Sequence, residues 1–360
     1  MIVPRKRHHP VPRAGAGFTL LEIMIALALG MIVIAALVIL FSNASATRRE
    51  VERTSRQLEN GRYAMQVLSD DMRHAGYFAE FKPDVLVAPA AKPDPCATAI
   101  ADLKAALPLQ VQGYYNPPSA STPSCLSDVR AGTDIVVVRR TSTCVRGSAD
   151  CDGALAGTPY FQASLCGGAT ELASNNNSDW YALDTADANL TRTKRDCATR
   201  ADIHRYLTRI YFVANNDVAG DGIPTLKRAE LGAGAGSGTA FTIVPIAEGV
   251  ENLQIEYGLD LDNDGAPDVF TADPDNYACA GSACVANWRN VMAARLNLLV
   301  RSTEATPGYS DAKVYVLGLK ADGTENRFPA SGTGYGDNYR RHVYQGEVRL
   351  NNPAGRRIVR

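Results

Sequence analysis

The distribution of apolar and polar residues predicts a membrane-spanning helix near the start of the chain. Residues 18–41 form an apolar run in which Glu22 is the only formally charged side chain. As an α-helix this run would be about 36 Å long, which is enough to cross the roughly 30 Å hydrocarbon core of a bilayer. We therefore predict a transmembrane helix over residues 18–41.

An amphipathic pattern follows this run and predicts that the helix continues through residues 42–76. Charged residues become frequent, yet apolar residues persist at helical spacing. These apolar positions are Val51, Leu58, Met65, Leu68, Met72 and Ala75. We expect this stripe to pack partly on the protein's own sheet and partly on neighbouring helices, with a two-stranded coiled coil as the alternative. Gly76 is placed to end the helix.

Beyond residue 76 the pattern is typical of β-strands. Short β-branched or alternating runs are separated by Gly, Pro, Asn and Asp. We predict strands over residues 133–139, 206–214, 241–246, 250–257, 295–301, 313–319 and 342–350. The predicted fold class is therefore α+β, with a long N-terminal helix packed on an antiparallel β-sheet head of residues 77–360. Residues 140–200 are expected to form a long, disulfide-pinned surface loop.

Composition adds a charge asymmetry to this picture. The 360 residues are 46% hydrophobic, and 37 basic against 38 acidic side chains give a net charge of −1, so no overall basic field exists to hold nucleic acid. The first 17 residues, however, contain Arg5, Lys6, Arg7 and Arg13 and no acid. The positive-inside rule predicts that this segment is cytoplasmic and that everything after residue 41 is exported.

All eight cysteines lie in the exported part, which fits disulfide formation in an oxidising compartment. Many connectivities are open to eight cysteines. Closure of short loops and proximity in the sequence favour Cys144 with Cys151, Cys279 with Cys284, Cys96 with Cys125, and Cys166 with Cys197. Zinc is the alternative, although the spacings are not C-x-x-C and no histidine is near.

Glu22 distinguishes the N-terminal segment from simpler export signals. An ionisable group in hydrocarbon costs at least about 2.5 kcal/mol unless it finds a partner. An ordinary secretory signal cut after 44–46, or a plain anchor, gives no reason for such a carboxylate. The segment therefore predicts a specific partner for Glu22.

The residues Gly17-Phe18-Thr19-Leu20-Leu21-Glu22 resemble the class III signal of type IV pilins and type II secretion pseudopilins. The resemblance implies that residues 1–17 are a leader, which a prepilin peptidase removes between Gly17 and Phe18. It also implies N-methylation of Phe18 and pairing of Glu22 with the terminal amine of a neighbouring subunit. Loss of the leader would change the formal charge from −1 to −5.

Further segments resemble minor pilins of the PilW type. These are residues 68–77, 221–228, 247–258, 288–301 and 339–352. The resemblance implies a pilin-like precursor that crosses the bacterial inner membrane once, with its N-terminus cytoplasmic and its head periplasmic, and that later reaches the pilus and cell surface. It also implies a role in pilus biogenesis, twitching motility and adhesion, either priming assembly or forming a tip complex.

The same resemblance implies its partners: other major and minor pilins, the prepilin peptidase and the inner-membrane assembly platform. It implies no enzymatic activity and no required cofactor. The alternatives are a J-type pseudopilin of a type II secretion system and, more remotely, an exported binding protein or hydrolase with an ordinary anchor.

One loop carries the chemistry of a calcium site. The candidate ligands are Asp260, Asp262, Asp264, the Ala266 carbonyl and Asp268. Their alternating oxygens, with a glycine for the sharp turn, suit Ca²⁺, and four carboxylates this close repel one another without a cation. The alternative is a hairpin turn rich in Asp and Gly.

Other chemistry is not indicated. The sequence contains neither G-x-S-x-G nor H-E-x-x-H, so these motifs do not indicate a catalytic site. A basic cluster at residues 192–200 is interleaved with Asp187, Asp196 and Asp202, which favours a solvated charged surface over a nucleic-acid site.

Overall fold

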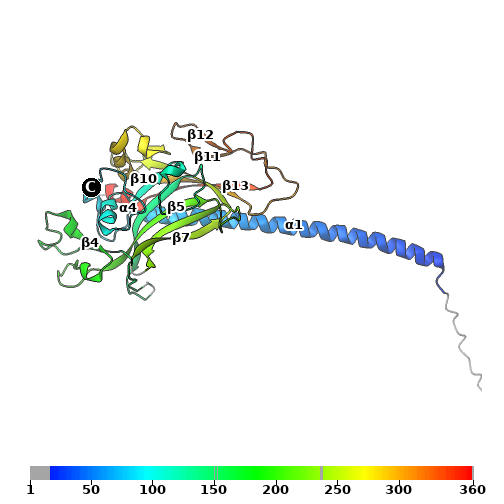
Figure 1. The fold of residues 1–360 in the computed structure, drawn as a ribbon, viewed down its shortest axis with the longest axis horizontal. Coiled ribbons are helices and arrows are strands. Elements are labelled where there is room, and N and C mark those ends of the chain that lie inside the picture. Colours follow the sequence, from blue (N-terminus) through cyan, green and yellow to red (C-terminus); the bar gives the residue numbers. More distant parts are fainter. Residues whose placement is uncertain (1–16, 150, 152, 236–237, 359–360) are drawn as a thin grey trace, which may run out of the picture. The chain divides into compact units, whose positions relative to one another are not determined.

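The computed structural model describes residues 17–149, 151, 153–235 and 238–358 (Figure 1). The chain divides into two compact units, residues 1–52 and 53–360. Helix α1 (Leu20–His74) begins in the first unit and ends in the second. The basic leader predicted over residues 1–17 lies outside the described residues except for Gly17.

The second unit holds the end of α1 and the predicted head of residues 77–360. The head contains a seven-stranded antiparallel sheet, drawn in Figure 1 around the label β5. Its main path runs β1-β2-β5-β3-β4, and β5 also pairs with β6, which pairs with β7. The strands are β1 (Val111–Tyr114), β2 (Ile135–Val145), β3 (Tyr160–Ala163), β4 (Tyr181–Asp184), β5 (Ile203–Ala214), β6 (Thr225–Ala233) and β7 (Thr239–Glu248).

A four-stranded antiparallel sheet and a two-stranded hairpin complete the strands described. The four-stranded order is β13-β10-β8-β9, and β11 pairs with β12. Their bounds are β8 (Val250–Leu259), β9 (Val269–Thr271), β10 (Val291–Arg301), β11 (Tyr315–Leu319), β12 (Glu325–Phe328) and β13 (Arg341–Arg349).

Short helices connect these strands. The α-helices are α2 (Ile100–Ala106), α3 (Val285–Arg289) and α4 (Asn351–Ile358), and α4 lies beside β10 (Figure 1). The 3-10 helices are η1 (Pro83–Val85), η2 (Ser119–Ser121), η3 (Asn177–Trp180), η4 (Asp187–Asn189), η6 (Pro274–Asn276) and η7 (Gly281–Cys284).

The predicted α+β class and antiparallel strands are confirmed. Each of the seven predicted strands overlaps an observed one, although the boundaries move by several residues. The expectation that residues 140–200 form one long loop was wrong in part. Strands β3 and β4 arise from this segment and extend the seven-stranded sheet, and their apolar side chains are buried.

Within the second unit, the last turns of α1 pack on both large sheets. Leu68 and Met72 are fully buried in a cluster that includes Val136, Tyr211 and Leu296. Burial of side chains of this size stabilises a fold by about 1.5–3 kcal/mol each. The predicted packing of the amphipathic stripe on the protein's own sheets is therefore confirmed for this part of the helix.

Gly76 allows the chain to leave α1 beside β2. Its φ of +72° lies in the left-handed region, which favours glycine. The Gly76 N–H donates to the Arg139 carbonyl at 2.9 Å, and a Cβ at this position would lie 2.5 Å from the Gln110 side chain. The sequence prediction that the helix ends here is confirmed.

Asp71 joins this end of α1 to the seven-stranded sheet. Its side chain is only 4% exposed and lies 2.8 Å from Arg140 Nη2 and 2.7 Å from Arg209 Nη1. Tyr211 Oη also donates to it. Burial alone would raise the pKa of Asp71, but the charges of Arg209 and Arg140 outweigh it and hold this pKa below its usual value.

Arg341 anchors the segment between β10 and β13 in the same way. Its side chain is fully buried and pairs with Glu251 of β8, and with Asp311 at 2.9 Å and Asp337 at 2.7 Å. Desolvation would lower the pKa of Arg341, yet the hydrogen bonds to these carboxylates raise it. The guanidinium is therefore charged and fully paired within the head.

Candidate functional site

The first turn of α1 holds the carboxylate that the sequence singled out. Thr19 precedes the first helical residue, and its backbone N–H and Oγ1 both donate to Glu22 Oε2, at 2.9 and 3.0 Å. The Glu22 N–H donates in return to Thr19 Oγ1 at 3.2 Å. This reciprocal arrangement is a capping box, which satisfies N–H groups that the helix start leaves without partners.

Sequence reasoning missed this local partner of Glu22. The signal was present, because Thr19-Leu20-Leu21-Glu22 fits the S/T-x-x-E pattern that precedes an apolar run. The carboxylate is nevertheless exposed, as are Gly17 and Phe18 on the predicted cleavage junction. Glu22 therefore keeps oxygen surface that can accept a further hydrogen bond.

The apolar part of α1 is almost entirely exposed within the described residues. Phe18 is 84% exposed and Phe41 is 76% exposed, and the large apolar side chains between them are also exposed. A helix of this length and hydropathy can cross a membrane. The predicted transmembrane segment at residues 18–41 thus has the exposed apolar surface that lipid or neighbouring helices would cover.

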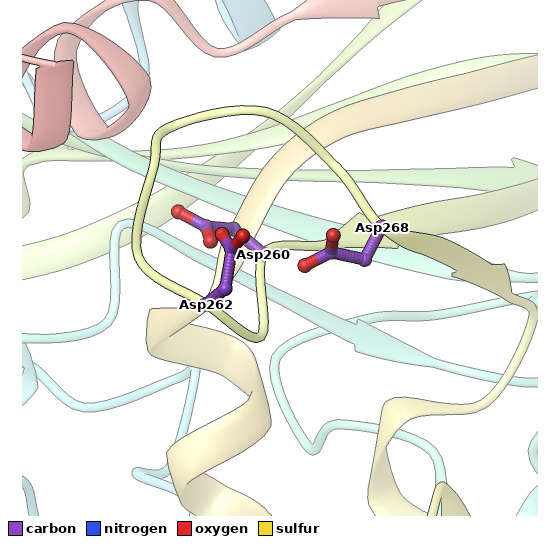
Figure 2. Close-up of side chains that lie close together, drawn as sticks. All are labelled: Asp260, Asp262 and Asp268. Atoms are coloured by element: carbon purple, nitrogen blue, oxygen red, sulfur yellow. The ribbon is translucent and has the colours of Figure 1, made fainter.

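The acidic loop between β8 and β9 brings together three of its predicted ligands. One carboxylate oxygen from each of Asp260, Asp262 and Asp268 lies within 4.8 Å of the others, as Figure 2 shows. Asp264 is not in this group, and its carboxylate accepts the Ala266 N–H at 2.7 Å. The loop therefore gathers part of the predicted ligand set.

Backbone N–H groups already bind the carboxylates of this loop. Asp260 accepts from the N–H of Asn263 at 2.6 Å and of Gly265 at 2.9 Å. Asp268 accepts from the Leu261 N–H at 2.7 Å. These contacts are of the kind that Asp makes in tight turns, so the turn interpretation accounts for the loop geometry.

Arg357 supplies a cation to this loop that the sequence analysis did not identify. It lies on α4, and its Nη1 is 2.9 Å from Oδ2 of Asp260. Burial would raise the pKa of Asp260, but the hydrogen bond from Arg357 and those from the backbone hold it below its usual value. No sequence signal joins Arg357 to a residue so far away along the chain. Calcium at this loop stays a prediction.

The four predicted disulfides are all present. The structure pairs Cys96 with Cys125, Cys144 with Cys151, Cys166 with Cys197, and Cys279 with Cys284. These bonds use all eight cysteines, so the zinc alternative is wrong.

The basic cluster at residues 192–200 is charge-paired, with Lys194 2.9 Å from Asp202 and Arg200 3.0 Å from Asp187.

Two family models match the chain. Residues 210–352 match the type IV pilus-assembly protein W family, PilW. Residues 12–38 match the prokaryotic N-terminal methylation motif, which covers the predicted junction and the capping box. Searches of curated proteins and of solved structures gave no match. The chain therefore matches a PilW-family type IV pilin in the C-terminal half of its head, and its N-terminal segment carries the methylation motif.

Proposed function

We propose that the chain is a minor pilin of a type IV pilus. It would be made as a precursor whose N-terminus is cytoplasmic and whose head is periplasmic, and prepilin peptidase would cut it between Gly17 and Phe18. The observation that carries the proposal is the capping box. It places the Glu22 carboxylate one turn from the proposed new terminus, on a helix whose apolar surface is exposed.

The physical role of Glu22 would change on cleavage. In the precursor its oxygen accepts from the Thr19 backbone and hydroxyl groups. Cleavage would free the amine of Phe18, which would then be methylated in a separate step. In a filament this cation from one subunit would pair with Glu22 of its neighbour. Such a pair would offset the cost of a carboxylate in an apolar helix core.

The head would sit outside this helical core and contact other pilins. In that position the chain would prime assembly or belong to a tip complex, and would contribute to twitching motility and adhesion. A J-type pseudopilin is the second candidate, because the N-terminal motif is common to both systems. The likeness of residues 221–228 and 351–352 to minor pilins favours the pilus.

Processing is the first test. The full chain is co-expressed with a prepilin peptidase, and the mature N-terminus is sequenced and weighed by mass spectrometry. We expect a methylated chain that begins at Phe18. A chain that begins at Thr47, or one that stays uncut at Phe18, would contradict the proposal.

Incorporation is the second test. The Glu22→Ala variant should insert into the membrane and be cut, yet be depleted from sheared pili relative to the membrane fraction. Glu22→Gln keeps the shape but removes the charge and should show the same loss, whereas Glu59→Ala, on the exposed surface of the same helix, should not. Normal incorporation of Glu22→Ala would refute the pairing role.

A further inference from the structure

One face of the seven-stranded sheet carries an unusual set of arginines. Arg205, Leu207 and Arg209 alternate along β5, so their side chains share a face. Arg140 of β2 lies opposite Leu207 in the antiparallel register and therefore points to the same side. Asp71, near the C-terminal end of α1, pairs with Arg140 and Arg209 on this face.

A bulge in β2 builds the wall beside these arginines. Thr141 pairs with Tyr206, but Val145 pairs with His204, so extra residues of β2 are pushed out of the ladder. The Cys144–Cys151 disulfide fixes this bulge to the following loop. Bulges of this kind re-aim side chains and are common beside binding sites.

The arginines and the bulge enclose a cavity of about 270 Å³. Arg140, Arg205 and Arg209 line one side, and Ser142 and Thr143 of the bulge add hydroxyl groups. Arg146 and Tyr160 also line the cavity, with the Arg146 guanidinium 4.9 Å from the Tyr160 ring centroid, and Leu207, Cys144 and Cys151 complete the lining. None of the described residues that line the cavity is acidic.

The four arginines that line the cavity outnumber the carboxylates that pair with them. Asp71 is shared by two arginines, Asp187 by two and Glu230 by three. Because one arginine bridges Asp71 and Glu230, six arginines share these three carboxylates. The hydrogen bonds from Arg200 and Arg146 lower the pKa of Asp187 to about 2, so this carboxylate stays charged and still leaves an excess of cations.

One donor of a cavity-lining arginine also lacks an acceptor. The Nε of Arg205 is buried, and no described residue accepts a hydrogen bond from it. The Nη2 of the same guanidinium donates to Glu230 at 3.1 Å, which holds the group in place. A buried donor without an acceptor costs about 1–3 kcal/mol, and more when it is charged, so an anion close to this guanidinium would offset part of that cost.

We propose that this cavity binds a small anionic ligand through a phosphate or carboxylate group. Guanidinium groups match these planar or tetrahedral oxyanions with paired N–H donors, and partial burial strengthens each hydrogen bond. Every residue that lines the cavity precedes residue 210, where the PilW match begins. The site is therefore a property of this chain's own head and does not depend on the pilin role.

The test is calorimetry on the detergent-solubilised full chain at fixed ionic strength. Inorganic phosphate and citrate are the two probes, with chloride as the reference ion. We expect saturable binding of at least one probe and none of chloride. Tighter phosphate binding would identify a phosphate ligand, and tighter citrate binding a polycarboxylate. Absence of binding by both probes would overturn the proposal.

Variants locate the bound anion. Arg205→Gln and Arg146→Gln, two arginines that line the cavity, should each weaken binding about tenfold or more, as expected for a lost charge-assisted hydrogen bond. Arg205→Lys keeps the charge and should lose less. Arg327→Gln, an exposed arginine on β12 that pairs with Glu325, should leave binding unchanged. Equal weakening by Arg327→Gln would refute a localised site.

The last control concerns two aspartates that are close in sequence to the cavity-lining Cys151. Asp150 and Asp152 flank Cys151 in the sequence and lie outside the described residues. The double variant Asp150→Asn/Asp152→Asn should bind the probes as the wild type does. Binding that appears only in this double variant would show that the chain's own carboxylates fill the cavity, and would overturn the proposal.

Discussion

Replacing Asp71 tests whether the buried ion pair at the end of α1 holds the helix on the head. Asp71→Asn keeps the side-chain shape but removes the charge that Arg140 and Arg209 contact at 2.8 and 2.7 Å. Both guanidiniums are largely buried, so Arg140 would lose its ion-pair partner without gaining water, and Arg209 would keep only Glu230. Breaking a buried pair by removing one partner costs about 3–5 kcal/mol. We expect a loss of this size in the free energy of unfolding.

The assay is urea unfolding of the full chain with its disulfides intact, followed by circular dichroism. The matched control is Asp70→Asn, because Asp70 is the neighbouring residue, is 51% exposed and pairs with an exposed Arg73. Exposed pairs contribute about 0–1 kcal/mol. The pKa of Asp71 is lowered in the fold, so its contribution should be lost as the pH falls toward and below 3.8. Equal losses for the two variants at pH 7 would refute the reasoning.

Three further predictions concern the head. Burial raises the pKa of Asp134 to about 7 from 3.8, so its contribution to the free energy of unfolding should fall as the pH rises from about 4 to about 7. Urea unfolding at a series of pH values measures this slope, and Asp134→Ala should remove it. Replacing both Cys166 and Cys197 by Ser opens a crosslink of sequence separation 31 and should cost about 3–4 kcal/mol in the same assay, and a negligible loss would contradict the chain-entropy argument. Arg357→Gln removes the cation beside Asp260, so if the loop binds Ca²⁺, the affinity of the loop for Ca²⁺ should rise about tenfold in calorimetry. If neither the wild type nor the variant gives heat at millimolar calcium, the loop is only a turn.

The strands that could be predicted are those whose core positions form continuous apolar or alternating runs, such as β8 and β10. Strand β6 was missed because Lys227, Arg228 and Glu230 interrupt its pattern. Its charges are tolerated because Glu230 pairs across the sheet with Arg209 at 2.7 Å, and this partner is invisible in the local sequence. Strands β3 and β4 were missed because they are short and lie among cysteines and loop residues.

The candidate sites divide in the same way. Glu22 could be found because an isolated carboxylate in an apolar run is a local feature, and its contact with Thr19 also follows from spacing. The pairing of Asp260 with Arg357 could not be found, because it depends on how α4 returns to the β8–β9 loop. The arginines of the cavity come from β2, from the residue directly after it and from β5, and only the observed register places them together.

The crosslinks are concentrated where the chain matches no family. Cys96–Cys125, Cys144–Cys151 and Cys166–Cys197 all precede residue 210, and only Cys279–Cys284 falls within the matched region. A proteolytic cut inside any of the three earlier loops would leave both fragments covalently joined and still paired to the sheet. The part of the head outside the family match would thus stay joined after nicking, which would suit the proposed exposure to proteases outside the cell.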